Sequence, residues 1–473
     1  MKMLLDGQWV DRNDKINVID PFDNSIVDTI PKGTKQDVEI ALKAAVKGFE
    51  ITKKMTVYDR AQILFKTAQI ISDNLDEYAA IIAREASKTI NEARKEASRC
   101  VNTLIVSAEE SKRIMGETIP FDSFPGGEKR RGYYYRFPIG VVLAITPFND
   151  PLNLVAHKLG PAIAAGNSVI LKPATVTPLS AIKLVEALLE AGLPPMAVQL
   201  ITGNGSEIGD SLVSDERVRM ISFTGGVEAG KHIAGKAGIK KIGMELGSNS
   251  PVIVWKDADL ELAVESSVSG SFWAAGQNCI GVQRLLVHRD IYDEFKTKFV
   301  ARTKQYKIGD KLKEDTDMGP MITETEAKRV ESWVNSAVEQ GAKVLIGGKR
   351  NGALYEPTVL ENVPPDATIH YEEVFGPTVN LYPVDDLDEA IKEANSMPYG
   401  LLAAIFTGNV DVAFKASYDL DCGGVMINDS TDYRLDSMPF GGVKYSGLGR
   451  EGIKFSLQEM TEPKVVCFYL PGI

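Results

Sequence analysis

The sequence predicts an α/β protein that contains parallel β-sheets and more than one domain. The chain has 473 residues, which is too long for a single hydrophobic core. Between residues 141 and 226, short apolar runs typical of strands alternate with longer helical patterns. This alternation predicts right-handed βαβ units, and a second series of the same kind follows Gly247.

In the first series, apolar runs that end at Gly or Pro predict the strands, and amphipathic or apolar patterns predict the helices. The expected strands are VVLAIT (141–146), SVILKP (168–173), VQLITG (198–203) and RMISFTG (219–225). The expected helices are 153–165, 178–191, 205–213 and one that begins near Gly226.

The second series predicts strands at 251–255, 284–288 and 403–407, and helices near 258–274, 323–340 and 386–396. Residues 1–30 suggest short strands, 35–115 read as helical, and 118–138 as a loop followed by a long exposed strand. The apolar tail VVCFYL usually finds a partner strand, so we expect it to pair with another subunit.

The composition excludes several classes of protein. The net charge is −11, from 64 acidic and 53 basic residues, which argues against a nucleic-acid-binding protein. No run approaches the roughly 18 apolar residues that span a bilayer, and the start has no signal-peptide pattern. We therefore expect a cytoplasmic protein with no membrane partner.

Four cysteines lie far apart, and their spacing argues against disulfides and against a metal site. For Cys100, Cys422 and Cys467 the expected role is that of a small buried apolar side chain. Cys279 is different because it ends the motif GQNC after a helix-like run.

The turns that follow the strands of a parallel sheet commonly bind nucleotides. GNGSEIG (203–209) and FTGGVEAG (223–230) each follow a strand. Neither matches the GxGxxG spacing, so each could equally be a plain tight turn. Lys172, at a strand end, could bind a ribose or phosphate or extend along the surface.

Seven motifs then occur in order: ITPFNDPL (145–152), LKPATVTP (171–178), ISFTGG (221–226), MELGSNSP (244–251), GQNC (276–279), EEVFGP (372–377) and PFGGVKYSGLGREG (439–452). Together they resemble the aldehyde dehydrogenase superfamily, and the chain looks closest to its lactaldehyde and phosphonoacetaldehyde dehydrogenase branch. The resemblance implies a Rossmann-like cofactor domain, an α/β catalytic domain and a small β oligomerisation arm.

The resemblance also implies NAD or NADP as cofactor. Lys172 and Glu373 would hold the ribose hydroxyls, Phe375 would pack near the nicotinamide ribose, and Gly225 would support the pyrophosphate at a helix N-terminus. The other positions expected at this site are Ile145, Thr146, Pro147, Phe148, Thr175, Gly205, Gly209, Phe223, Thr224, Gly226, Leu246 and Gly247.

Two positions depart from the family pattern. Gly226 stands where a serine is usual, which removes one hydroxyl donor. Thr175 stands where NAD-specific members often carry a glutamate. A glutamate would repel a 2′-phosphate, whereas threonine would not and can donate a hydrogen bond. We therefore expect NADP to be accepted, with NAD use also possible.

For catalysis the resemblance implies that Cys279 attacks the aldehyde, because a thiolate yields a thioester that water can cleave. Asn149 and the Cys279 backbone N–H would form an oxyanion hole. Glu245 would be the general base. Members that transfer the acyl group to coenzyme A generally lack this glutamate, which makes a CoA-acylating enzyme the weaker alternative. The sequence also leaves open a cysteine hydrolase and a non-catalytic binding protein.

The substrate is less clear from the sequence. Arg99, His157 and Arg434 lie in segments that line the substrate tunnel of the family. An arginine pair would suit a phosphonate, sulfonate or carboxylate, and the alternatives are surface ion pairs for the arginines and a core contact for His157. We expect a short anionic or 2-hydroxy aldehyde such as lactaldehyde, sulfolactaldehyde or phosphonoacetaldehyde. Asn278 replaces an arginine typical of non-phosphorylating glyceraldehyde-3-phosphate dehydrogenases, which argues against that substrate.

The predicted domains are a cofactor domain (1–115 and 137–247), a catalytic domain (248–444), and an oligomerisation arm and tail (116–136 and 445–473). The arm and tail would join subunits into a homodimer or homotetramer.

Overall fold

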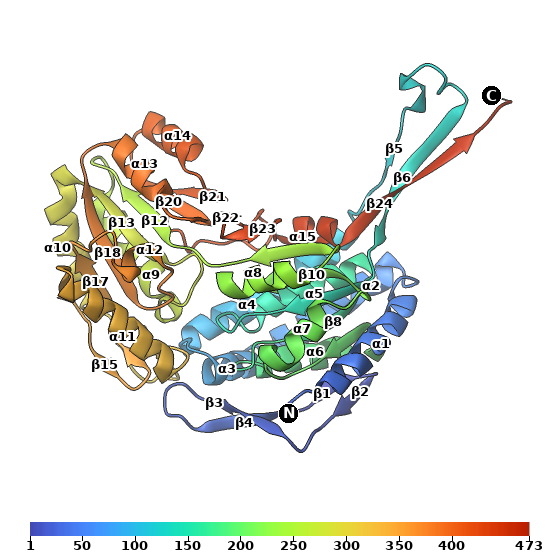
Figure 1. Ribbon diagram of the computed structural model, residues 1–473, viewed down its shortest axis with the longest axis horizontal. Helices are drawn as coiled ribbons and strands as arrows, with labels where there is room; N and C mark the ends of the chain where they lie inside the picture. Colours follow the sequence, from blue (N-terminus) through green and yellow to red (C-terminus); the bar gives the residue numbers. More distant parts are fainter. Residues whose placement is uncertain (473) are drawn as a thin grey trace.

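The computed structural model describes residues 1–472 and contains two α/β bodies and a projecting β arm (Figure 1). Residue 473, the last residue of the predicted tail, lies outside the described residues. Within residues 1–472, the strands of the first body form a sheet in the order β2-β1-β9-β8-β7-β10-β11-β23. Strands β9, β8, β7, β10 and β11 are mutually parallel, as the alternating pattern predicts.

Strands of the first sheet are β1 (Met3–Leu5), β2 (Gln8–Val10), β7 (Val141–Ile145), β8 (Ser168–Lys172), β9 (Val198–Leu200), β10 (Val218–Thr224), β11 (Lys241–Glu245) and β23 (Gly447–Leu448). Helices α2 (Val57–Asp73), α3 (Leu75–Glu85), α4 (Ile90–Ser111), α5 (Asn153–Ala165) and α6 (Leu179–Glu190) pack on one face of this sheet. Helices α1 (Lys35–Thr52), α7 (Gly205–Val213) and α8 (Val227–Lys236) pack on the other.

The second body has a sheet in the order β14-β17-β18-β13-β12-β20-β21 within the described chain. Its strands are β12 (Ser250–Val254), β13 (Val282–His288), β14 (Lys343–Ile346), β17 (Thr358–Glu361), β18 (Thr378–Val384), β20 (Leu402–Phe406) and β21 (Gly424–Ile427). Helices α9 (Leu260–Phe272), α10 (Tyr292–Thr303) and α11 (Glu324–Glu339) pack on one face, and α13 (Leu387–Asn395) and α14 (Val410–Asp419) on the other.

The arm is formed by β5 (Glu117–Thr118), β6 (Arg130–Pro138) and β24 (Thr461–Tyr469), and it extends away from both bodies (Figure 1). Strand β24 pairs with β6 of the same chain over its whole length, from Thr461 opposite Pro138 to Tyr469 opposite Arg130. Strand β6 of the same chain therefore supplies a partner for one edge of the tail, and pairing of the tail with another subunit stays a prediction. The other edge of β24 has no partner strand within residues 1–472.

The residues before β24 do not lie in the arm. Strand β23 pairs with β11 of the first sheet, and helix α15 (Ile453–Glu459) packs its apolar face into the core of the first body. The arm is therefore shorter than the predicted segment 445–473. The remaining elements are the hairpin β3 (Lys15–Ile19) and β4 (Ile26–Pro31), the short pairs β15 (Arg350–Asn351) with β16 (Leu354–Tyr355) and β19 (Tyr399–Gly400) with β22 (Val443–Lys444), and helix α12 (Thr368–Tyr371).

Two of the three cysteines that were expected to be buried differ from that expectation. Cys100 is fully buried, as expected, on α4. Cys422 is partly exposed, and Cys467 is exposed on the arm. The difference for Cys467 follows from the arm itself, because a projecting ribbon has no core in which to bury a thiol.

Candidate active site

Cys279 lies on a loop that follows helix α9 and an unusual turn. Ala274, Ala275 and Gly276 are all left-handed, with φ values of 50°, 55° and 69°. A non-glycine residue in this region costs about 1–2 kcal/mol, so the turn must be held by its surroundings. The Gln277 amide donates to the carbonyl oxygen of Ala274 at 2.9 Å and accepts from the N–H of Ile322 at 2.9 Å.

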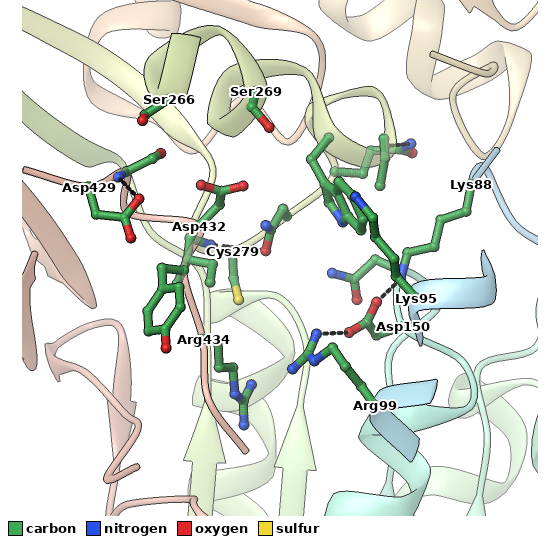
Figure 2. Close-up of a pocket in the computed structure, with 18 of the residues that line it drawn as sticks. Lys88, Lys95, Arg99, Asp150, Ser266, Ser269, Cys279, Asp429, Asp432 and Arg434 are labelled. Atoms are coloured by element: carbon green, nitrogen blue, oxygen red, sulfur yellow. Dashed lines mark hydrogen bonds and ion pairs between the residues drawn. The ribbon is translucent and has the colours of Figure 1, made fainter. Parts of the chain in front are cut away.

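Two cavities meet at this cysteine. The first, about 570 Å³, lies between α4, α9 and the loop 429–434, and Figure 2 shows the Cys279 sulfur facing into it. The second, about 510 Å³, lies at the carboxyl edge of the first sheet. Asn149, Leu154 and Cys279 line both cavities. A group bound in one cavity can therefore reach a group bound in the other at Cys279.

The surroundings of Cys279 favour the neutral thiol. Burial raises the pKa of the thiol to about 12, and the positive charge of Arg434 partly opposes this. Glu373 and Glu245 add to the rise. Because the thiolate is the nucleophile, the thiol needs a nearby base before it can attack.

Glu245 is the candidate for such a base. It ends strand β11, is 3% exposed, and lines the second cavity with Cys279. Its Oε2 atom has no hydrogen-bond partner among residues 1–472. Burial and then the nearby Glu451 raise the pKa of the Glu245 carboxyl well above 4.5. A pKa raised toward the working pH suits a general base.

Glu451 was not predicted from the sequence, although it lies inside the motif GREG. Its carboxylate accepts from Lys158 at 2.9 Å and from Arg434 at 3.2 Å. Burial raises its pKa, but these two cations outweigh burial and hold the pKa below its ordinary value. Glu245 thus faces a neighbour that stays ionised.

The second cavity is walled by most of the residues expected to hold the cofactor. Phe148 and Phe375 meet edge to face across it, with ring centroids 5.6 Å apart. The predicted residues that line it are Thr146, Pro147, Phe148, Phe223, Thr224, Gly225, Gly226, Leu246, Gly247, Glu373 and Phe375. Ala174, Ala229, Arg329 and Trp333 also line it and were not predicted. Ile145, Lys172, Thr175, Gly205 and Gly209 lie outside this lining.

Buried polar groups in this region fit a nucleotide. Lys172 is 6% exposed, and its ammonium contacts only the Pro173 carbonyl, at 3.2 Å, among residues 1–472. Burial lowers the pKa of Lys172 to about 8. The hydroxyls of Thr146 and Thr224 are buried and have no partner in the described chain. A hydroxylated, charged ligand would satisfy all three groups.

Glu373 and the two helix starts complete this fit. Glu373 accepts from the N–H of Ser248 at 2.9 Å, and desolvation raises its pKa to about 7. Helix α8 begins after Gly226, and α7 begins at Gly205, each without a side-chain cap. Free N–H groups at a helix start favour phosphate. These residues therefore suit the ribose and phosphate groups of a dinucleotide.

Thr175 already uses its hydroxyl. Its Oγ1 donates to the Gly203 carbonyl at 3.0 Å. The expected donation to a 2′-phosphate would require this bond to break. Thr175 is therefore expected to favour NADP only because it has no carboxylate that would repel the 2′-phosphate.

Arg99 and Arg434 both line the first cavity, as Figure 2 shows, but His157 does not. The Arg434 side chain is 8% exposed and lies over the Phe440 ring at 3.7 Å. The buried Nε atoms of Arg99 and Arg434 have no partner among residues 1–472. Because both Nε atoms are buried, they do not face a ligand in the cavity, and each arginine acts on the cavity through its charge and its other nitrogens.

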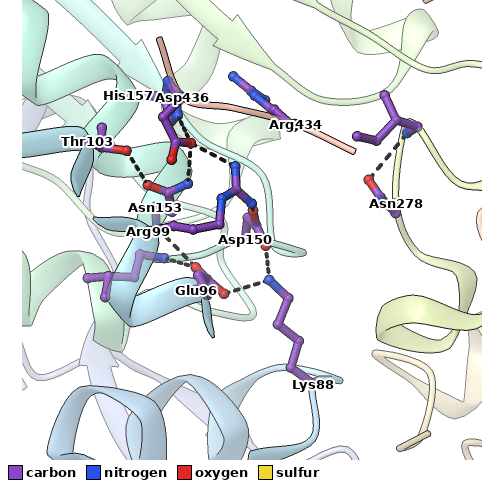
Figure 3. Close-up of polar contacts among 12 residues, drawn as sticks. Lys88, Glu96, Arg99, Thr103, Asp150, Asn153, His157, Asn278, Arg434 and Asp436 are labelled. Atoms are coloured by element: carbon purple, nitrogen blue, oxygen red, sulfur yellow. Dashed lines mark hydrogen bonds and ion pairs between the residues drawn. The ribbon is translucent and has the colours of Figure 1, made fainter. Parts of the chain in front are cut away.

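His157 is fully buried behind the cavity, and its Nε2 lies 2.9 Å from Asp436 (Figure 3). Burial and the nearby Arg434 lower the pKa of His157, so its ring is not a cation at neutral pH. The geometry therefore corrects the prediction that His157 binds substrate. The alternative interpretation, a core hydrogen bond, describes what is found.

Helix α4 carries three charged residues at i, i+4 and i+7 that reach three parts of the site. Glu92 accepts from the N–H of Ala274 at 2.8 Å, beside the strained turn. Glu96 accepts from the N–H of Leu152 at 2.8 Å and of Asn153 at 3.1 Å, which caps helix α5 just after Asn149. Arg99 donates to Asp436 at 2.8 Å. One helix face thus contacts the turn before Cys279, the segment after Asn149, and Asp436.

Lys88 completes this network (Figure 3). Its ammonium lies 2.7 Å from Glu96 and also pairs with Asp150, the residue after Asn149. Lys88, Glu96, Asp150 and Asp436 were not predicted. The sequence held a weak signal only for Glu96, in the spacing of charges along α4.

The fold and the site together are those of a nucleotide-dependent oxidoreductase. The sequence profile of the aldehyde dehydrogenase family matches residues 9–466, and the chain belongs to this family. It is an NAD(P)-dependent aldehyde dehydrogenase.

Two curated relatives and two solved structures are especially similar. Aspartate-semialdehyde dehydrogenase 1 of Pseudomonas canavaninivorans is 50% identical over 457 residues, 97% of this chain and 97% of the relative. The 3-sulfolactaldehyde dehydrogenase of Priestia aryabhattai is 46% identical over 468 residues, 99% of this chain and 98% of the relative.

The crystal structure of aldehyde dehydrogenase 21 from Physcomitrella patens, in complex with its reaction product succinate, has a TM-score of 0.97 and 41% identity. The alignment covers 100% of this chain and 98% of the Physcomitrella patens chain. Glyceraldehyde-3-phosphate dehydrogenase GapN from Methanocaldococcus jannaschii, complexed with NADP, has a TM-score of 0.94 and 41% identity, over 97% of this chain and 100% of its own.

Two kinds of feature are absent from the part of the chain that the structure describes. Within residues 1–472, no helix combines the length and the apolar character that a membrane crossing requires. The same residues contain no cluster of His, Cys, Asp and Glu side chains suited to a metal ion.

Proposed function

We propose that this enzyme oxidises a short aldehyde with an acidic group to the free carboxylic acid, through a thioester on Cys279. The proposal rests on one observation: Cys279, Arg434 and Arg99 line the same cavity. Guanidinium groups bind carboxylate or sulfonate well.

In the first half of the reaction, Glu245 accepts the proton of the Cys279 thiol, and the sulfur bonds to the aldehyde carbon. The Asn149 amide and the Cys279 N–H stabilise the negative oxygen, a contribution on the order of 10²–10³ in rate for each donor. When bound, the nicotinamide ring supplies the hydride acceptor. Loss of hydride from the carbon leaves the thioester.

Before the second half, Glu245 passes the proton from Cys279 to solvent and is again a carboxylate. It then takes a proton from water, and the resulting hydroxyl bonds to the thioester carbon. The carbon–sulfur bond then breaks, which releases the acid and returns the Cys279 thiolate. Glu245 lies in a buried setting that raises its pKa, which makes its carboxylate a stronger base than an exposed glutamate. Hydrolysis by water, and not transfer to coenzyme A, is the expected outcome.

The names of similar proteins support an acidic substrate. Aspartate semialdehyde and 3-sulfolactaldehyde appear in the names of two relatives, and succinate is the product bound in one similar structure. Each of these compounds carries a carboxylate or sulfonate apart from the reacting carbon. The shared chemistry matches the two arginines of this chain.

We also propose that NADP is accepted. Position 175 has no carboxylate to repel a 2′-phosphate, and the similar GapN structure was solved with NADP. The orphaned ammonium of Lys172 and the buried Thr146 and Thr224 hydroxyls would serve NAD and NADP alike.

A homodimer or homotetramer is the assembly that the arm supports best. The free edge of β24 carries open backbone groups that a second chain could pair. Side chains exposed on the arm include Tyr135, Phe137, Val465, Phe468 and Tyr469. Light scattering at two protein concentrations tests this assembly, and a monomer at both would contradict it.

The function is tested by NADPH formation at 340 nm with succinate semialdehyde and with butanal, a neutral aldehyde of the same chain length. We expect a higher kcat/KM for the acid, and free succinate as product without coenzyme A. Arg434→Ala should remove the preference for the acid. A wild-type preference for butanal, or a requirement for coenzyme A, would contradict the proposal.

A further inference from the structure

A single glutamine side chain holds the backbone on both sides of Glu373. Gln283 lies on strand β13, is 6% exposed, and contacts the segment 372–375. Its amide nitrogen donates to the Glu372 carbonyl at 2.8 Å, and its amide oxygen accepts from the N–H of Val374 at 3.0 Å. Both distances are those of ordinary strong hydrogen bonds. The two residues that flank Glu373 are therefore fixed to one side chain.

The segment needs this support because it has no secondary structure of its own. Residues 372–375 belong to neither a helix nor a strand, so no regular ladder pairs their backbone groups. Phe375 is left-handed, with a φ of 47°, a conformation that is unfavourable for a residue with a Cβ atom. Such a conformation persists only where the surroundings hold it.

Asn249 adds a second tie to the same segment. Its amide nitrogen donates to the His370 carbonyl at 2.8 Å and to the Glu372 carbonyl at 3.3 Å. The buried Arg284 guanidinium donates to the Asn249 amide oxygen at 2.8 Å, which fixes the orientation of that amide. Because Gln283 and Arg284 are consecutive residues, both ties depend on one point of strand β13.

The Glu373 side chain is itself closely confined. Its carboxylate accepts from the N–H of Ser248 at 2.9 Å and lines the cofactor cavity together with Cys279. A Cβ atom at Gly247 would overlap this carboxylate, so the fit depends on the absence of a side chain there. Gln283 follows Cys279 by four residues. One short stretch of chain therefore carries both the cysteine and the support for Glu373.

We propose that Gln283 is a positioning residue for the cofactor, which holds Glu373 where its carboxylate can bind ribose hydroxyls in the cavity shared with Cys279. This inference rests on the proposed binding of the cofactor at Glu373. An amide suits the position because it can donate and accept at once, and the segment presents one carbonyl and one N–H. Because Glu373 is held before the cofactor arrives, less order has to be gained on binding, which raises affinity.

The test measures the Kd for NADPH or NADH, whichever the wild-type enzyme binds more tightly, by fluorescence titration without aldehyde. Gln283→Met keeps the length of the side chain and removes both hydrogen bonds, and we expect the Kd to rise by about 10-fold. The KM for the aldehyde should change much less. The milder Gln283→Glu keeps the size of the side chain and the acceptor for Val374, and should raise the Kd less.

Gln199→Met is the matched control. Gln199 is also buried, and it also donates to one backbone carbonyl, that of Met196 at 3.1 Å, and accepts from one backbone N–H, that of Asp6 at 2.8 Å. It lies in the first sheet, away from Glu373. The same substitution there should leave the Kd unchanged, and an equal rise in both variants would show a general effect of losing a buried amide and would overturn the inference.

A double-mutant cycle with Glu373→Ala shows whether Gln283 acts through Glu373. We expect Glu373→Ala alone to raise the Kd, and Gln283→Met to have no further effect in that background. An unchanged Kd in Gln283→Met, or a rise of the same size with and without Glu373, would overturn the inference and leave the cofactor contact of Glu373 in place. An unchanged Kd in Glu373→Ala would overturn that contact, and the inference with it.

Discussion

The two cavities that meet at Cys279 are built in different ways. The cofactor cavity is walled by residues at strand ends and helix starts of one sheet, and much of its surface is backbone and apolar side chain. The substrate cavity is walled by charged side chains from α4, α9 and the loop 429–434, which come together from distant parts of the chain. The first cavity is therefore set by the fold, whereas the second depends on a network of charges that single substitutions can change.

The largest effect is expected where the two cavities join. Cys279→Ala should lower kcat by about 10³-fold or more, because loss of a covalent nucleophile leaves only binding and electrostatic contributions. Steady-state rates with NADP and succinate semialdehyde measure this. Cys467→Ala, on the exposed arm, is the matched control and should retain full activity. Equal activity in the two variants would show that Cys279 is not the nucleophile.

A smaller loss of activity is expected when the network of charges around Glu96, next to the first cavity, is broken. Glu96→Ala removes the acceptor for the N–H groups of Leu152 and Asn153 and the partner of Lys88. The Asn149 loop should then shift, and kcat should fall by about 10-fold to 100-fold, with a smaller change in the KM for cofactor. Glu96→Gln keeps the acceptor and should recover much of the activity.

Glu109→Ala, on the exposed side of the same helix, controls for a general loss of helix stability. If Glu109→Ala and Glu96→Ala lowered kcat alike, the network would have no specific role.

On the cofactor side, a substitution is expected to change the preference between NADP and NAD and not to abolish activity. Thr175→Glu restores a carboxylate that would face a 2′-phosphate, and the KM for NADP should rise by about 10-fold through like-charge repulsion. The KM for NAD should change less. Thr175→Gln introduces a side chain of the same size as glutamate but without its charge. It therefore separates the effect of charge on KM from the effect of size. An equal rise for both cofactors in Thr175→Glu would mean that position 175 does not face the 2′-phosphate.

The smallest effect concerns stability. The pKa of Glu373 is raised to about 7, so the folded protein holds this proton more tightly than the unfolded chain does. Its contribution to stability is present below about pH 4.5 and is lost as the pH rises through 7. Glu373→Gln without cofactor should therefore gain about 2 °C in Tm relative to wild type between pH 5.5 and pH 8.5. A difference in Tm that does not change with pH would contradict the raised pKa.

The sequence predicted the cofactor side better than the substrate side, for a physical reason. Strand β7 and helix α5 follow from short local patterns, and the residues at their ends then fall at one sheet edge. Every residue of α5 is buried, so its periodicity could not indicate which face lines a cavity, and His157 was assigned wrongly.

Contacts between remote segments were also beyond the sequence patterns. The pairing of β24 with β6 joins residues more than 300 positions apart in the chain. The loop that carries Ser430, Asp432 and Arg434 has no motif, and only the folded chain brings it beside Cys279. Local sequence patterns predict individual helices and strands. Contacts between distant segments depend on how those helices and strands pack, which local patterns do not contain.

The central claim is that an acyl group is carried on Cys279 and released by water that Glu245 activates. The most direct test is the intact mass of Glu245→Gln after mixing with NADP and succinate semialdehyde. We predict one equivalent of NADPH formed in a rapid burst, and a succinyl group that peptide mapping places on Cys279. Full turnover with no acyl adduct would contradict the role of Glu245, and the absence of both burst and adduct would contradict the thioester itself.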